Sequence, residues 1–177
     1  MAHIPVNHPA RPVYRVLAGL TSTYILLFGI AGLVRTWGES FFDRGDHIVL
    51  GLRTNPAFSL LSIGAALLLL FAAFYGRNLD HYLYLFGAGV FYLSGFVMMA
   101  LLRTDLNLLN FAMRNCIVSY VIGTVFLLAG LYGKVGSREF QESEDRFRHG
   151  EAEWRDFEPA MSDTAGSDRA ARRRSGR

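Results

Sequence analysis

Several polar side chains in this 177-residue chain stand close together at the edges of its apolar segments. Asn107, Asn110 and Arg114 are three and four residues apart, so a helix would place them on one side. Asn115 follows directly, and Asn55 precedes another apolar segment at what we expect to be the same membrane level. We call these five residues the outer polar cluster, and they are the best candidates for a site.

Two readings of the outer polar cluster remain open. In the structural reading, the amides cap helices and satisfy backbone groups, and Arg114 pairs with Asp105. In the functional reading, the cluster is a small pocket for an anionic headgroup or a peptide, and Arg114 supplies its charge. Substitution of Arg114 separates the two readings.

A second candidate is an aromatic stripe in the charged tail. Phe140, Phe147 and Trp154 recur every seven residues, which is nearly two helical turns, so a helix would align them in a narrow stripe. One reading is a surface-lying helix that continues from the last apolar segment. The other is a docking stripe for a partner protein.

The remaining ionisable residues show no catalytic or metal-binding pattern. The five histidines are expected to be solvated or interfacial rather than ligands: His3, His8, His47, His81 and His149. The sequence has no Gly-rich phosphate loop, nucleophile elbow or HExxH helix. The single cysteine, Cys116, excludes an intramolecular disulfide and a cysteine-based metal cluster. We therefore expect no enzymatic activity, no cofactor and no metal.

Four charge-free windows must position these residues. They are Val16–Val34, Thr54–Gly76, Tyr82–Leu102 and Asn115–Gly133. A hydrocarbon core about 30 Å thick needs roughly 20 apolar helical residues, so each window is long enough to span it. The sequence predicts an all-α, antiparallel bundle of four transmembrane helices at about 13–34, 56–76, 82–102 and 113–133. A polar arm (1–12) precedes it, and a charged tail (134–177) follows, amphipathic to about 158 and then disordered.

Basic residues near the predicted span ends give the expected orientation. Four spans place both termini on one side, which carries seven basic residues: Arg11, Arg15, Arg77, Lys134, Arg138, Arg146 and Arg148. The opposite side carries five: Arg35, Arg44, Arg53, Arg103 and Arg114. This excess favours cytoplasmic termini in an inner (cell) membrane. The longest connection, 35–56, contains Trp37, Phe41 and Phe42, which predicts that it lies at the headgroup level.

Two stretches give the chain a family resemblance. They are Leu52-Arg-Thr-Asn-Pro-Ala-Phe-Ser-Leu-Leu-Ser62, with an Asn-Pro before the second span, and Asn115-Cys-Ile-Val-Ser-Tyr-Val-Ile-Gly123 at the start of the fourth. Residues 13–133 resemble a family of uncharacterised small four-span bacterial membrane proteins. Similar members carry histidines a turn into these spans, where this chain has Phe58, Ser62 and Ser119. The resemblance implies architecture and membrane location only.

The expected function is that of a multi-pass membrane protein without catalytic activity. Ionisable residues are absent from the middle of every window, which argues against a proton relay, an ion-coupled transporter or a haem-binding anchor. We expect a structural or accessory component of a membrane complex, whose partners are the lipid bilayer and another membrane protein or a second copy, but no nucleic acid. The alternative is an oligomeric small transporter or channel subunit. Small residues such as Gly29, Gly32 and Gly130 predict close packing among the spans, with self-association as the second reading.

Overall fold

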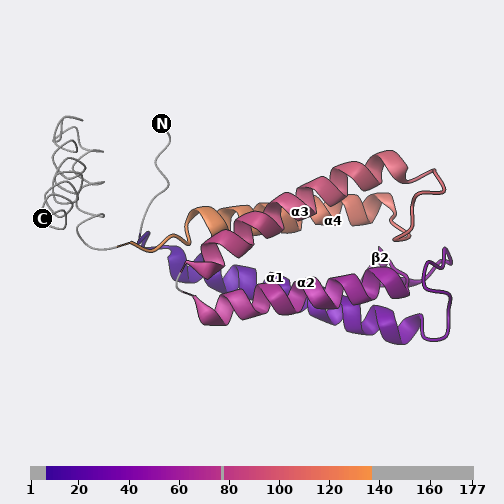
Figure 1. Ribbon diagram of the computed structural model, residues 1–177, viewed down its shortest axis with the longest axis horizontal. Coiled ribbons are helices and arrows are strands. Elements are labelled where there is room, and N and C mark those ends of the chain that lie inside the picture. The colour runs from indigo at the N-terminus through magenta and orange to yellow at the C-terminus, as the bar shows by residue number, and fades with distance from the viewer. Residues whose placement is uncertain (1–6, 77, 137–177) are drawn as a thin grey trace, which may run out of the picture. The chain divides into compact units, whose positions relative to one another are not determined.

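Four helices dominate the computed structural model, which describes residues 7–76 and 78–136 (Figure 1). They are α1 (Arg11–Arg35), α2 (Pro56–Tyr75), α3 (Leu79–Leu101) and α4 (Met113–Leu131). Each is long and apolar enough to cross a membrane. The all-α prediction is confirmed, and the helices begin and end close to the expected span limits.

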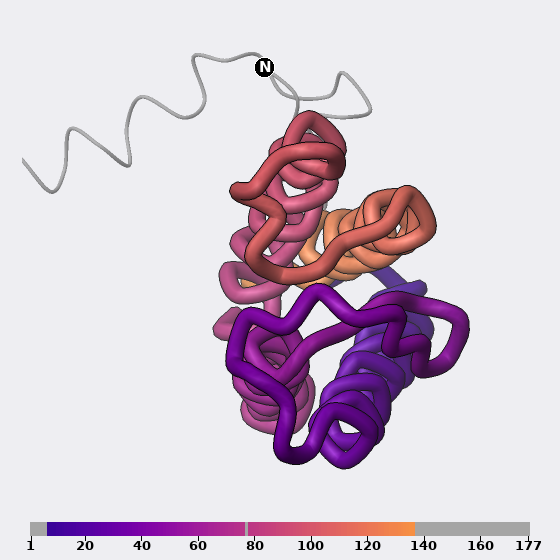
Figure 2. Tube along the Cα trace, turned by 90° about the vertical axis from the view of Figure 1, so that its right-hand side faces the viewer, coloured from indigo at the N-terminus to yellow at the C-terminus, as the bar shows by residue number. Residues whose placement is uncertain are grey.

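The helices pack as two hairpins, α1 against α2 and α3 against α4 (Figure 1). Contacts of α1 with α4 and of α2 with α3 join the hairpins and are less extensive. Viewed from one end, the connection between α1 and α2 covers the ends of those helices, and the connection between α3 and α4 lies beside it (Figure 2). We call this the loop end; the opposite end, with Arg11, Asp80 and Tyr132, is the terminal end.

Glycines allow the two helices of each hairpin to approach closely, as the sequence predicted. A Cβ added at Gly29 of α1 would lie 2.9 Å from the Ser59 carbonyl oxygen of α2. One added at Gly130 of α4 would lie 2.8 Å from the Leu85 side chain of α3. A Cβ would not fit at either position without a shift of its neighbours, and at Gly29 those neighbours include backbone atoms of α2.

Aromatic side chains fill the centre where the two hairpins meet. The rings of Tyr84 and Phe126 stack with centroids 5.6 Å apart, and Phe91 stacks on Phe126 at 5.8 Å. Ala18 of α1 and Ala66 of α2 are fully buried against this group. Large rings from α3 and α4 thus oppose small residues from α1 and α2.

The connection between α1 and α2 contains a short hairpin that the sequence analysis did not foresee. Strands β1 (Ile48–Val49) and β2 (Leu52–Arg53) pair antiparallel around Leu50 and Gly51, whose φ angles are +48° and +82°. Positive φ at both central residues is the type I′ arrangement that suits a two-residue hairpin loop. The side chain of Leu52 is buried, so the hairpin closes over the bundle.

The predicted aromatic surface of this connection is present. Trp37 is 81% exposed, and Phe41 and Phe42 are each about half exposed. Such side chains at the end of a membrane helix suit the headgroup region. The tail stripe Phe140, Phe147 and Trp154 lies outside the described residues.

Candidate functional site

Asn55, the first member of the outer polar cluster, is fully buried at the start of α2. Its side-chain oxygen accepts a hydrogen bond from the Phe58 backbone N–H at 2.8 Å, which caps the helix. Its amide nitrogen donates to the Leu108 carbonyl at 2.8 Å and to the Asp43 carbonyl at 3.1 Å. Asn55 therefore joins both connections at the loop end to α2.

Asn115 makes the corresponding link from the first turn of α4. Its side-chain oxygen accepts from the backbone N–H groups of Arg53 (3.1 Å) and Ala112 (3.3 Å). Its amide nitrogen donates to the Arg53 carbonyl at 2.8 Å. Asn115 thus holds strand β2 against α4, and no more than one of its amide hydrogens remains unused.

Asn107 and Asn110 lie in the connection before α4 rather than on a helix. Asn107 brackets Phe111, accepting from its N–H at 2.8 Å and donating to its carbonyl at 2.9 Å. Asn110 has a φ of +53° and donates to the carbonyls of Gly45 (2.7 Å) and Thr54 (3.2 Å). The expectation that helical spacing aligns these two residues with Arg114 is wrong, because α4 begins only at Met113.

Arg114 is exposed, and the pairing expected for it is also wrong. Asp105 pairs with Arg44 instead, at 2.9 Å. No hydrogen bond or ion pair joins Arg114 to any residue in the described part of the chain, whereas the four asparagines bind backbone groups. The amides of the outer polar cluster hold loops in place, and the structure brings none of them to Arg114 to form a shared pocket.

A second polar group, which the sequence analysis missed, lies at the terminal end. The Asp80 carboxylate is 2% exposed and pairs with Arg11 at 2.9 Å. Arg11 also donates from Nε to the Gly133 carbonyl at 2.9 Å, so one arginine joins α1, the start of α3 and the segment after α4. Asp80 stands in a short polar stretch between two apolar windows, and nothing in the sequence there indicates that its carboxylate is buried.

We expected His81 to be solvated or interfacial, and the structure shows that it is buried. It is 5% exposed, and its Nδ1 lies 2.7 Å from the Gly130 carbonyl oxygen. Glycine at position 130 lets α3 approach closely enough for this contact. His81 is a buried link between α3 and α4 rather than a solvated side chain.

Arg15 is bound to the last turn of α2. Its Nε donates to the Ala73 carbonyl at 2.6 Å and its Nη2 to the Phe74 carbonyl at 3.2 Å. Both carbonyls belong to the last turn of α2, where helix carbonyls in general lack an intrahelical partner and the negative end of the helix dipole favours a cation. Arg15 therefore caps α2 from a neighbouring helix, and both of its recorded bonds are to neutral groups.

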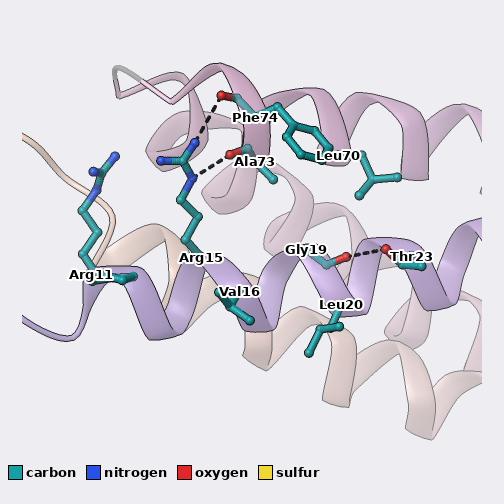
Figure 3. A pocket seen from close by; sticks show the side chains of 10 residues that line it. Arg11, Arg15, Val16, Gly19, Leu20, Thr23, Leu70, Ala73 and Phe74 are labelled. Carbon is teal, nitrogen blue, oxygen red and sulfur yellow. Dashed lines mark hydrogen bonds between the residues drawn. The ribbon is translucent and has the colours of Figure 1, made fainter.

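An open groove of about 530 Å³ runs between α1 and α2 below Arg15 (Figure 3). Apolar and small residues dominate its lining, which is Arg11, Pro12, Arg15, Val16, Gly19, Leu20 and Thr23 from α1 with Leu70, Ala73 and Phe74 from α2. A Cβ at Gly19 would meet no atom within 4 Å. The Thr23 hydroxyl donates back to the Gly19 carbonyl at 2.9 Å, so its proton is not offered to the groove.

A smaller cavity of about 40 Å³ lies inside the bundle near the loop end. Its lining includes Phe58 and Ser62 of α2 and Ser119 of α4. Both serines are 6% exposed, and neither hydroxyl is bonded to another described residue. At about 40 Å³ the cavity has room for water, one molecule of which needs roughly 10–15 Å³.

Three potential metal ligands approach one another in the first connection. Carboxylate and imidazole atoms of Glu39, Asp43 and His47 lie within 4.8 Å of one another. His47 Nε2 is 3.1 Å from Asp43 Oδ2, which also accepts from the Gly45 N–H at 2.7 Å. These contacts account for the cluster as part of the loop, so the expectation of no metal stays a prediction.

Comparisons of the chain with protein-family models, with curated proteins and with solved structures found no match. The family resemblance therefore also stays a prediction. In the described residues, polar side chains at the loop end and at the terminal end link neighbouring elements. An open groove lies beneath Arg15, and a small cavity lies inside the bundle.

Proposed function

We propose that this chain is a multi-pass inner-membrane protein that serves as a structural or accessory component of a membrane complex. The observation that supports this proposal is that the polar side chains at the helix ends make hydrogen bonds and ion pairs within the protein. At both ends of the four helices, they bind backbone groups and one another across elements, as Asn115 does with Arg53 and Arg11 with Asp80. Polar groups that bond within the protein stabilise its fold, which is what a structural component requires.

The distribution of charge along the helices supports the membrane location. Charged side chains on the described helices stand in the first or last turns or close to them, as Arg15, Arg35 and Arg114 do. Large apolar side chains cover the outside, with Leu20 and Phe96 each more than 60% exposed. Such a surface is stable in lipid and would aggregate in water.

The proposed orientation places both termini in the cytoplasm. Arg11, Arg15 and Lys134 lie at the terminal end, and the sequence adds further basic residues on that side. Basic residues within short distances of span ends are retained on the cytoplasmic side. The loop end, with Trp37 and the β1–β2 hairpin, then faces the opposite side of the membrane.

Crosslinking followed by purification of the full chain from native membranes tests the accessory role. We expect a membrane protein to be recovered with the chain in a fixed ratio. Recovery of the chain as an oligomer alone, combined with ion flux after reconstitution into liposomes, would contradict the proposal and favour a small transporter or channel subunit. A haem or quinone that purifies with the chain would also contradict it.

A further inference from the structure

We propose that the groove between α1 and α2 binds one acyl chain of an anionic phospholipid, whose phosphate is bound by Arg15. The proposal rests on the membrane location proposed above but not on the accessory role. It concerns the groove lined by Val16, Gly19 and Leu20 on one side and by Ala73 and Phe74 on the other (Figure 3).

The dimensions of the groove match one lipid tail in one leaflet. Its lining on α1 extends from Arg11 to Thr23, which at 1.5 Å per residue corresponds to about 18 Å of helix. Half of a hydrocarbon core about 30 Å thick is about 15 Å. The groove therefore begins at headgroup level and ends near the bilayer midplane.

The small residues Gly19 and Ala73 leave the space between the helices open. A Cβ at Gly19 would meet no atom within 4 Å, although the same helix packs tightly on α2 at Gly29. Val16 and Leu20, 61% and 63% exposed, form the walls of the groove. Methylene groups of a lipid tail are the apolar material that a membrane supplies to such a space.

The two arginines at the groove mouth differ in how their charge is compensated. The Arg11 charge is balanced by the Asp80 carboxylate at 2.9 Å. Arg15 bonds only to the Ala73 and Phe74 carbonyls, so its charge meets no carboxylate among the described residues. A guanidinium has five N–H donors, and those left over on Arg15 can bind a phosphate.

The bonds from Arg15 to α2 also fix the guanidinium in position. Because two donors are held by carbonyls, the remaining donors are ordered before a ligand arrives, which lowers the entropic cost of binding. In Figure 3 the guanidinium lies between α1 and the last turn of α2, at the mouth of the groove. A lipid phosphate at that level would place its acyl chain beside Gly19.

The test uses the purified full chain in phosphatidylcholine nanodiscs with and without added phosphatidylglycerol. Retained phosphatidylglycerol is measured by native mass spectrometry, and thermal unfolding is measured in parallel. We expect phosphatidylglycerol to be retained in preference to phosphatidylcholine and to raise the unfolding temperature. Arg15→Gln should weaken retention about tenfold, since a hydrogen bond between charged groups is lost.

Gly19→Leu is the sharper variant, because it fills the groove without changing any charge. Its matched control is Gly64→Leu on α2, where a Cβ also meets no atom within 4 Å but which does not line the groove. We expect Gly19→Leu to abolish the preference for phosphatidylglycerol and Gly64→Leu to retain it. If Gly19→Leu changes neither retention nor the unfolding temperature, the lipid site is disproved.

Two further outcomes separate this inference from the proposal on which it rests. Equal retention of both lipids by the unaltered chain would contradict the lipid site while leaving the membrane location intact. Recovery of the chain from the soluble fraction of cells would instead contradict the membrane location. If inorganic phosphate competes fully with phosphatidylglycerol, a phosphate site without a lipid tail replaces the proposed one.

Discussion

The side-chain amide of Asn115 binds both backbone groups of Arg53, accepting from its N–H at 3.1 Å and donating to its carbonyl at 2.8 Å. An asparagine at the start of a helix in one hairpin thereby completes the hydrogen bonding of a strand that precedes α2 in the other. Asn55 and Asn115 are themselves buried, and their side-chain amides supply hydrogen bonds that these backbone groups would otherwise have to make with water.

Replacement of Asn115 by alanine should destabilise the fold strongly. The change leaves the backbone groups of Arg53 and the N–H of Ala112 without their partner, and a buried polar group that loses its partner costs about 1–3 kcal/mol. We expect a loss of about 3 kcal/mol in the free energy of unfolding, measured by denaturant titration in detergent. The neighbouring Arg114→Ala should change it by less than about 0.5 kcal/mol, because Arg114 is exposed.

Arg114→Ala also tests the functional reading of the outer polar cluster. If the cluster only holds loops, the variant retains partner recovery and lipid binding at the level of the unaltered chain. A selective loss of either, with folding intact, would restore the pocket reading.

Arg11→Gln should lower the free energy of unfolding more than Asp80→Asn does. In Arg11→Gln the Asp80 carboxylate stays buried without its cation, and breaking a buried pair from one side costs about 3 kcal/mol. In Asp80→Asn the acceptor for the His81 N–H is kept and the buried charge is gone. Thermal unfolding of both single variants and the double variant checks this, and additive losses would show that the pair is not coupled.

Gly29→Ala should separate α1 from α2. The added methyl group would lie 2.9 Å from the Ser59 carbonyl oxygen and 3.0 Å from the Ile63 nitrogen, and backbone atoms cannot move aside as a flexible side chain can. We expect a destabilisation of about 1–3 kcal/mol, the usual range for overpacking. Gly64→Ala is the control, since its Cβ enters open space and alanine favours a helix; equal effects of the two variants would contradict the packing described.

Tyr84→Phe should leave stability unchanged or raise it. The Tyr84 hydroxyl is fully buried and has no hydrogen-bond partner among the described residues, so its removal relieves an unsatisfied group. Tyr92→Phe is the matched control, because the Tyr92 hydroxyl lies 2.8 Å from Thr124 Oγ1 and its removal breaks a link between α3 and α4. A larger loss of unfolding temperature for Tyr84→Phe than for Tyr92→Phe would contradict this description.

Much of the fold could be predicted from the sequence because the membrane imposes long charge-free helices. Pro56 begins α2 as expected, since proline suits a first helical turn and Asn55 caps it. Close packing at Gly29 and Gly130 also followed from residue size. The helix limits and caps depend on residues near one another in the chain, and the close packing depends on the small size of glycine rather than on one particular partner.

The features that could not be predicted depend on contacts between distant segments. Asp105 pairs with Arg44 rather than with Arg114, a choice decided by how the two connections lie beside each other. His81 and Asp80 are buried because α1 and α4 cover the start of α3, although the sequence there reads as a polar turn. The groove beneath Arg15 likewise requires the relative placement of Gly19 and Ala73 on two helices.

Membrane topology tests the central claim, that four helices cross the membrane with both termini in the cytoplasm. The natural Cys116 is fully buried, so cysteines introduced elsewhere can be labelled against a low background. The measurement is labelling of intact cells by a membrane-impermeant maleimide, with cysteine at Trp37 or Arg103 of the loop end or appended after Arg177. We expect labelling of the two loop variants in intact cells and of the appended cysteine only after lysis. Labelling of the appended cysteine in intact cells, or of neither loop variant, would contradict the account.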